Sequence, residues 1–193
     1  MITPKNREYR AFEFESDEMK IEGKAVALET PTVLYEYDGI KYYEIISRDA
    51  FAEAKMDDVV LVENHQGRAA AKTKNGTLQL RLSDDGLFIS ADLSKNATGR
   101  ELHEAIKNGF YDKMSFAFTI RQDSYDQKTR TRRIEKIDRL FDVSAVDFPA
   151  YNDTSISARS FFEAEAEKER MEMRMREEKK KRLELLIDIE RSL

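Results

Sequence analysis

Hydrophobic and polar positions alternate one by one through several short stretches of the first 150 residues. Such alternation places successive side chains on opposite faces of a β-strand. In residues 113–120 the larger apolar side chains fall on one face, and Ser115, Ala117 and Thr119 fall on the other. The large face predicts a contact with the core, and the small face leaves room for another group to approach. Repeated short stretches of this kind predict a mainly β fold, either a barrel or a sandwich, with a few helices.

Three dipeptides predict tight turns between these strands: Asp38-Gly39, Asn75-Gly76 and Asp85-Gly86. Asp, Asn and Gly tolerate the positive φ angles that short hairpin turns require. Each pair adjoins an alternating apolar stretch, which indicates hairpins.

Two helices are expected to interrupt the strands. Residues 47–54 predict a short one, capped by the serine at its start. A second has the capping-box spacing from Thr98 to Glu101, an apolar stripe, and Gly109 where the helix should end. His103 lies beside that stripe, so it is expected to face solvent and receives no role.

The composition changes after Pro149 and the polar residues 151–155. Residues 160–193 contain no Gly or Pro, and acidic and basic residues recur at the i,i+4 spacing that stabilises a helix. We therefore expect two parts: a domain over residues 1–159 and a charged, solvated helical segment over 160–193. That helix either has no role beyond that of a linker or offers a surface for a partner or a second copy. The apolar residues of such a surface would be Leu183, Leu186, Ile187 and Leu193.

The overall composition excludes several classes of function. The 193 residues carry a net charge of -5 and no cysteine, so disulfides, thiolate nucleophiles and cysteine metal sites are excluded. The basic run 179–182 lies among glutamates and does not predict nucleic-acid binding. No apolar run reaches the roughly 18 residues of a membrane span, and no signal-peptide pattern opens the chain. We expect no membrane association, no metal and no cofactor.

Three polar residues on predicted strands are candidates for catalysis. His65 follows an apolar, β-branched stretch that would deliver its imidazole from a strand end, as a general base requires. Ser115 lies on the small face of its strand, where a substrate carbonyl has room to approach. Asp142 lies in another apolar strand and is suited to orient an imidazole. Asp147 competes for that role, but an odd spacing puts it on the opposite face, so only one of the two fits.

Structural interpretations of the same residues remain open at this point. A histidine at a strand end is often a surface residue, and small residues on a strand often mark close packing. An aspartate in an apolar strand is either at an edge of the sheet or paired.

The order of these stretches resembles the prohead protease family of tailed bacteriophages over about 9–159. The matching segments are Glu63-Asn64-His65-Gln66, residues 113–118, residues 140–151, and the helix region 99–110. The family is distantly similar to the herpesvirus assembly proteases. The resemblance therefore implies a herpesvirus-protease-like β-barrel followed by the charged C-terminal helix.

The resemblance also implies roles for individual residues. His65 matches the family's histidine and Ser115 its strand serine, while Asp142 stands where the family usually has glutamate. Gln66 stands where an acidic residue is common. The backbone amides of Ala150 and Tyr151 would form the oxyanion hole.

The implied activity is that of a serine endopeptidase of capsid maturation. Its substrates would be the major capsid protein or its scaffold segment, and the enzyme itself, inside the prohead assembling in the bacterial cytoplasm. A homo-oligomer is compatible with the apolar end of the tail. The alternative is a nonenzymatic capsid-assembly or scaffold protein in which the charged helix is the working part.

Overall fold

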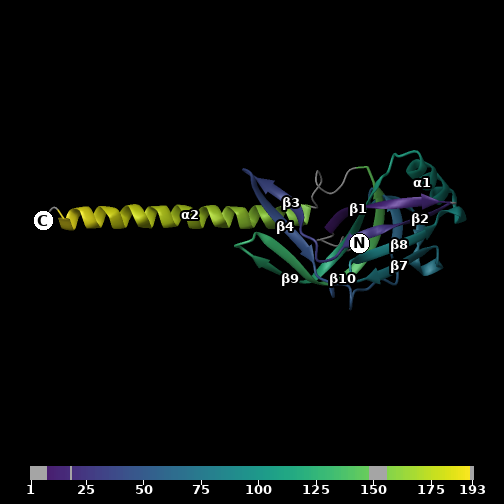
Figure 1. Ribbon diagram of the computed structural model, residues 1–193, viewed down its shortest axis with the longest axis horizontal. Helices are drawn as coiled ribbons and strands as arrows, with labels where there is room; N and C mark the ends of the chain where they lie inside the picture. Colours follow the sequence, from purple (N-terminus) through teal and green to yellow (C-terminus); the bar gives the residue numbers. More distant parts are fainter. Residues whose placement is uncertain (1–7, 18, 148–155, 192–193) are drawn as a thin grey trace.

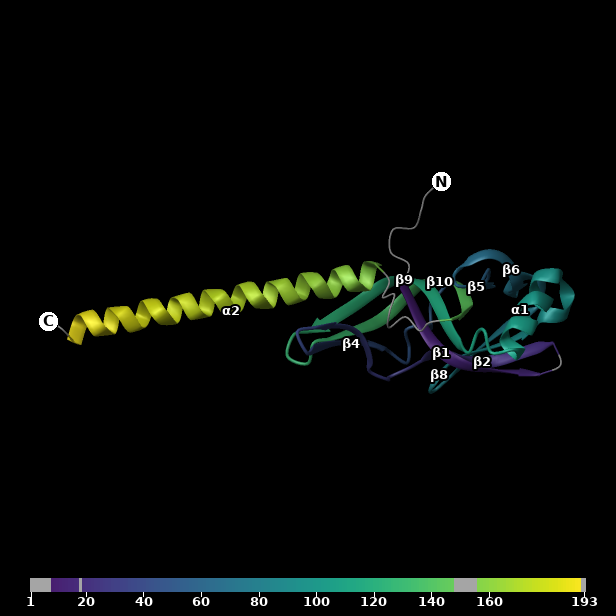
Figure 2. The same ribbon diagram turned by 90° about the horizontal axis from the view of Figure 1, so that it is seen from above.

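The protein, described by a computed structural model, has a body of β-strands and one long projecting helix (Figure 1). The structure describes residues 8–17, 19–147 and 156–191. Helix α1 lies at the end of the body opposite to the projecting helix α2 in both views (Figures 1 and 2).

The regular elements follow one another in chain order. They are β1 (Glu8–Asp17), β2 (Lys20–Ala27), β3 (Thr32–Tyr37), β4 (Ile40–Ile46), β5 (Val60–Glu63), β6 (Gln66–Lys72), η1 (Thr73–Asn75), β7 (Leu78–Ser83), β8 (Gly86–Asp92), η2 (Leu93–Lys95), α1 (Ala97–Lys107), β9 (Lys113–Asp126), β10 (Thr131–Val146) and α2 (Ile156–Arg191).

The strands form one strongly branched sheet. Its main order is β3-β4-β10-β9-β1-β2-β8-β7, with β5 attached to β10 and β6 attached to β5. The long strand β10 pairs in parallel with β4 along residues 131–134 and with β5 along residues 142–145, and it pairs with β9 in antiparallel fashion on its other side. The predicted mainly β fold with a few helices is confirmed. In the described ranges no pairing joins β3 to β7, so the structure shows no closed barrel there, and the herpesvirus-protease-like barrel stays a prediction.

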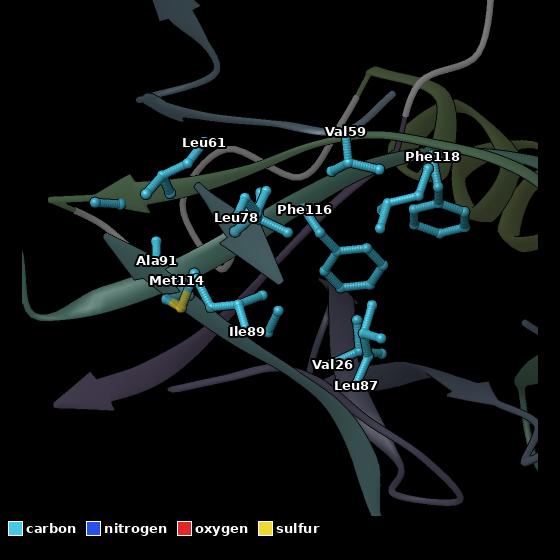
Figure 3. Close-up of a cluster of buried hydrophobic side chains, with 14 of the residues drawn as sticks. Val26, Val59, Leu61, Leu78, Leu87, Ile89, Ala91, Met114, Phe116 and Phe118 are labelled. Atoms are coloured by element: carbon cyan, nitrogen blue, oxygen red, sulfur yellow. The ribbon is translucent and has the colours of Figure 1, made fainter. Parts of the chain in front are cut away.

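The core lies on the face of β9 that the alternation predicted. Met114, Phe116 and Phe118 are fully buried, and the last two rings stack with centroids 5.0 Å apart. Burying each such side chain stabilises the fold by roughly 1.5–3 kcal/mol. In Figure 3 these side chains meet residues of β2, β5, β7 and β8 and of the segment before β5. The labelled partners are Val26, Val59, Leu61, Leu78, Leu87, Ile89 and Ala91.

Two of the local predictions need correction. Residues 47–54 form consecutive turns instead of a helix, with hydrogen bonds from Ala50 N to Ser47 O and from Ala52 N to Asp49 O. Asp38-Gly39 is the predicted hairpin turn, since both residues have positive φ. Asp85-Gly86 is not, because Gly86 already pairs with Ser83 in the β7–β8 ladder.

Helix α1 forms where the sequence predicted it, but it starts earlier. Its N-cap is Asn96 instead of Thr98, and the Asn96 side-chain oxygen accepts a hydrogen bond from Gly99 N at 2.6 Å. Gly109 follows the helix with φ 75°, as predicted for its C-terminal end.

His103 is only 6% exposed, so the solvent-facing prediction was wrong. The buried positions of α1 are 99, 102, 103 and 106, a helical i, i+3, i+4, i+7 stripe. Gly99 occupies one of these positions without a side chain, which hid the stripe's true width in the sequence.

Helix α2 begins at Ile156 and docks its first turns on the body. Phe162 and Ala166 are buried against Leu34 and Tyr42 in a second, smaller core cluster. An ion pair from Arg130 Nε to Glu169 Oε2, 3.1 Å long, borders this contact. The expectation of a wholly solvated helix was therefore wrong for these turns.

Beyond Arg170 the described side chains of α2 are mostly exposed, including Leu183, Leu186 and Ile187. The helix projects away from the β body in both views (Figures 1 and 2). Of the described helices, none combines the length and the apolar composition that crossing a bilayer demands.

The close packing of α1 generates a prediction for Gly99→Ala. A Cβ atom at Gly99 would lie 2.5 Å from Leu93 O and 3.1 Å from Ala70 O, both of them backbone atoms. Because the backbone must shift to admit it, we expect a loss of about 1–3 kcal/mol in the free energy of unfolding. Urea denaturation measures the loss, with Glu104→Ala on the exposed face of α1 as control. An unchanged midpoint in Gly99→Ala would contradict the prediction.

Candidate active site

The site begins with the two-residue turn that joins β5 to β6. Asn64 and His65 have φ values of 42° and 59°, and Glu63 pairs with Gln66 on either side of them. Positive φ at both central residues is typical of the tight hairpin turn whose twist matches the flanking strands. Asn and His are among the non-glycine residues that adopt this conformation most readily. The Asn-His dipeptide is therefore a turn, and the imidazole belongs to its second residue.

Strand β10 holds this turn in place. Asn64 N donates to Ala145 O at 3.0 Å, and the Asn64 side chain donates to Asp147 Oδ2 at 3.3 Å. His65 N donates to Ser144 Oγ at 3.1 Å. These bonds fix the turn against the last residues of the strand that also carries Asp142.

His65 and Asp142 form a close pair. The distance from His65 Nδ1 to Asp142 Oδ1 is 2.6 Å, and the two side chains are 16% and 5% exposed. An ionised carboxylate only accepts hydrogen bonds, so Nδ1 carries the proton in this contact. In a neutral imidazole of that tautomer, Nε2 is the nitrogen able to accept a proton. The pair thus has the arrangement in which an acid orients a general base.

Ser115 lies next to this pair across the β9–β10 ladder. Ser115 is directly opposite Ser144, and Ala117 is opposite Asp142. Directly opposed residues of antiparallel strands point to the same face, with Cβ atoms about 5 Å apart. Ser115 therefore shares a face with Ser144 and Asp142.

The hydroxyl of Ser115 is buried without a hydrogen bond. Ser115 is 2% exposed, and its Oγ has no partner in the part of the chain that the structure describes. Buried hydroxyls are nearly always satisfied, so an exception calls for an explanation. A nucleophile whose reaction partner is supplied by the substrate complex is one such explanation.

Sequence reasoning missed Ser144, which is the serine in direct contact with the histidine. Its Oγ lies 3.1 Å from His65 Nδ1 and donates to Asp142 Oδ1 at 2.9 Å. The contact is to Nδ1, the nitrogen already engaged by the carboxylate, so this hydroxyl is not placed as a nucleophile. The available signal was its spacing: Ser144 is two residues after Asp142 and shares its strand face.

The remaining predicted site residues have different outcomes. Asp147 contacts the Asn64 side chain: its Oδ2 accepts from the Asn64 amide at 3.3 Å, and its N–H donates to Asn64 Oδ1 at 3.4 Å. Ala150 and Tyr151, the predicted oxyanion-hole residues, lie outside the described residues. Within the described ranges no group of three acidic or histidine side chains is arranged to hold a metal ion.

Comparison with known proteins gives one match. The profile of the family described as "Caudovirus prohead serine protease" matches residues 5–169, which include the turn, β9, β10 and the docked start of α2. No curated protein and no solved structure matches the chain. Because the profile covers most of the chain and spans the whole His65, Asp142 and Ser115 arrangement, the chain belongs to the caudovirus prohead serine protease family.

Proposed function

We propose that this protein is a serine endopeptidase that cleaves the major capsid protein or its scaffold segment during prohead assembly. The single observation that carries the proposal is the 2.6 Å pair of His65 and Asp142, two positions along the β9–β10 ladder from a serine whose Oγ has no partner among the described residues. Family membership supports a role as a capsid maturation protease. The reaction would take place inside the prohead as it assembles in the host cytoplasm.

In the proposed mechanism Ser115 Oγ attacks the scissile carbonyl while His65 Nε2 takes its proton. Asp142 keeps the proton on Nδ1 and stabilises the imidazolium that forms. The same imidazolium then protonates the leaving amine, and water attacks the acyl-enzyme with His65 again acting as base. Asp142 is shorter by one methylene than a glutamate would be as the third member of the triad. It still reaches His65 Nδ1, because the turn brings His65 onto β10 itself.

Burial of Ser115 adds a requirement to this mechanism. A hydroxyl that is 2% exposed cannot meet a carbonyl carbon at bonding distance. Cleavage therefore needs an opening of the face that carries Ser115, Ser144 and Asp142. An opening that is brief in the free enzyme would spare most other proteins before assembly and still let a small reagent reach Ser115.

The second candidate is a nonenzymatic assembly or scaffold protein. The exposed outer part of α2 is the observation that favours it, since a projecting helix suits a binding partner. A fluorophosphonate probe separates the two functions, because only an activated serine forms the covalent adduct. Labelling at Ser115, located by peptide mass spectrometry, supports the enzyme.

Replacing either reacting residue tests the proposal most directly. Ser115→Ala and His65→Ala are each expected to lower cleavage of the capsid protein by about 10⁴-fold or more, since the members of a triad act as a unit. Intact-mass analysis after co-expression with the phage's capsid protein measures this. Ser90→Ala, which removes a half-buried serine on β8 that bonds Glu22, is the control. Near wild-type cleavage by either active-site variant, with the control active, would rule out the assignment.

The two aspartates provide a matched pair. We expect Asp142→Asn to lower kcat by about 10²–10⁴-fold, because an amide no longer fixes the Nδ1–H tautomer. Asp147→Asn should change kcat by less than about 10-fold, since Asp147 only supports the Asn64 side chain. Steady-state rates on one peptide decide between them. The opposite ranking would transfer the role to Asp147.

Self-cleavage is the second part of the proposal. Bonds within α2 are protected by the helix and by the burial of Phe162 and Ala166, so we expect cleavage in the span from about residue 151 to the start of α2 at Ile156. Trimming should depend on Ser115. Mass spectrometry of the wild type and Ser115→Ala, incubated at several concentrations, measures it. Equal trimming of both proteins, or an intact tail in active enzyme, would contradict self-processing.

The outer part of α2 is proposed to direct the protease into the prohead. Confinement with substrate in a closed shell raises the effective concentration of both. A chain shortened after residue 176 keeps the docked turns and loses the projecting part. It should cleave capsid protein in solution yet be absent from purified proheads. Unchanged incorporation would reject the targeting role.

A further inference from the structure

Ser144 is the most completely buried polar residue beside the proposed active site. It is 0% exposed, and it lies between Val143 and Ala145 on β10. All its side-chain contacts given above go to His65 or Asp142. A serine in an apolar strand interior serves packing no better than alanine, so its hydroxyl calls for a separate reason.

We propose that Ser144 is a positioning residue: its hydroxyl locks the His65 backbone and the Asp142 carboxylate into one arrangement, so that the imidazole faces Ser115. This inference rests on the proposed protease function. It assigns Ser144 no contact with the substrate and no bond-making step.

The hydrogen-bond inventory of the hydroxyl supports this role. A serine hydroxyl has one donor and two acceptor sites. Ser144 donates its proton to Asp142 Oδ1 at 2.9 Å and accepts the His65 N–H at 3.1 Å. Asp142 Oδ1 therefore receives two hydrogen bonds, one from Ser144 and one from His65 Nδ1 at 2.6 Å. One oxygen atom of Ser144 thus connects the backbone of the base to the acid that orients it.

The strained backbone of His65 makes such a lock necessary. A non-glycine residue at φ 59° persists only when its surroundings hold it there. Asn64 N is held by Ala145 O, but the amide of His65 itself is held by the Ser144 hydroxyl. Removing the hydroxyl leaves that amide without this acceptor and frees the imidazole to rotate away from Asp142.

The position of Ser144 also explains how it affects the distance between the His65 imidazole and Ser115. The two serines are directly opposed in the β9–β10 ladder. A displacement of the turn therefore changes the distance between the imidazole and the nucleophile without changing either reacting residue. Misplacement of about 1 Å in an active site can cost about 100-fold in rate.

The kinetic test compares Ser144→Ala, Ser144→Thr and wild type, with Ser124→Ala as matched control. Ser124 is likewise a strand serine that donates to a carboxylate, Glu135, but on the exposed part of β9. We expect Ser144→Ala to lower kcat by about 10- to 100-fold with KM changed by about twofold or less. Fluorophosphonate should still label Ser115 to completion, but more slowly by the same factor. Ser144→Thr keeps the hydroxyl and should recover most of the rate.

A spectroscopic readout separates positioning from loss of fold. The chain has two histidines, so ¹⁵N-histidine NMR shows two imidazoles, with His103 as internal reference. In the Ser115→Ala background, which avoids self-cleavage, His65 should show a single Nδ1–H tautomer. Adding Ser144→Ala should make the His65 signals average between tautomers and leave those of His103 unchanged.

The outcomes are distinct. Wild-type kcat and unchanged His65 signals in Ser144→Ala would overturn the inference. So would a rate loss that disappears well below the melting temperature, or a folded Ser144→Thr as slow as Ser144→Ala. If Ser144→Thr does not fold, Ser144→Ala and the NMR signals decide alone. Failure of wild type to cleave capsid protein or to label Ser115 would instead reject the proposed protease function.

Discussion

The attachment of the Asn64-His65 turn to β10 is the interaction on which the site depends. A two-residue turn with positive φ at both positions projects the imidazole sideways from the end of β5. Parallel pairing of β5 with residues 142–145 of β10 places the turn beside Ala145, and the His65 side chain contacts Asp142 from there. The hydrogen bonds to Ala145 O and Ser144 Oγ then fix the position of the turn along β10. His65 and Asp142, the proposed base and its orienting acid, are therefore both held by β10, which limits their relative motion.

The length of β10 connects this site to the tail. Its first residues pair with β4 and its last residues pair with β5. The ribbon that β10 forms with β9 therefore supports a different part of the protein at each of its two ends. At the end near the β9–β10 turn, Arg132 lies over the Phe161 ring at 4.3 Å and pairs with Asp123 at 2.6 Å. Burial and the nearby Glu169 carboxylate raise the pKa of Tyr125, so its phenol stays neutral beneath α2. The docked turns of the tail and the proposed active site thus share a scaffold without sharing residues.

The two serines that face each other across the β9–β10 ladder show opposite hydrogen-bonding states. Ser144 uses its hydroxyl as both donor and acceptor, whereas Ser115 Oγ has no partner among the described residues. An unsatisfied buried hydroxyl costs about 1–3 kcal/mol of stability, which most proteins avoid. Such local costs concentrate at functional sites, where the missing partner arrives with the substrate. This contrast supports the proposed roles of Ser115 as nucleophile and of Ser144 as positioning residue.

The sequence alone determined the β class, the core face of β9 and the helix α1, because strand alternation and helix-end residues are local signals. It also singled out His65, Ser115 and Asp142 as candidates through their resemblance to a known family, and it kept Asp147 as an alternative to Asp142, since the odd spacing lets only one of the two fit. Tertiary structure decided the rest. Phe162 and Ala166 look like members of a charged tail until Leu34 and Tyr42 are brought to them from far along the chain. His103 looks exposed because Gly99 completes its stripe without a side chain. Ser144 acquires a role only when the β5–β6 turn reaches β10, since a hydroxyl's partners are set by pairing register, which no local pattern encodes.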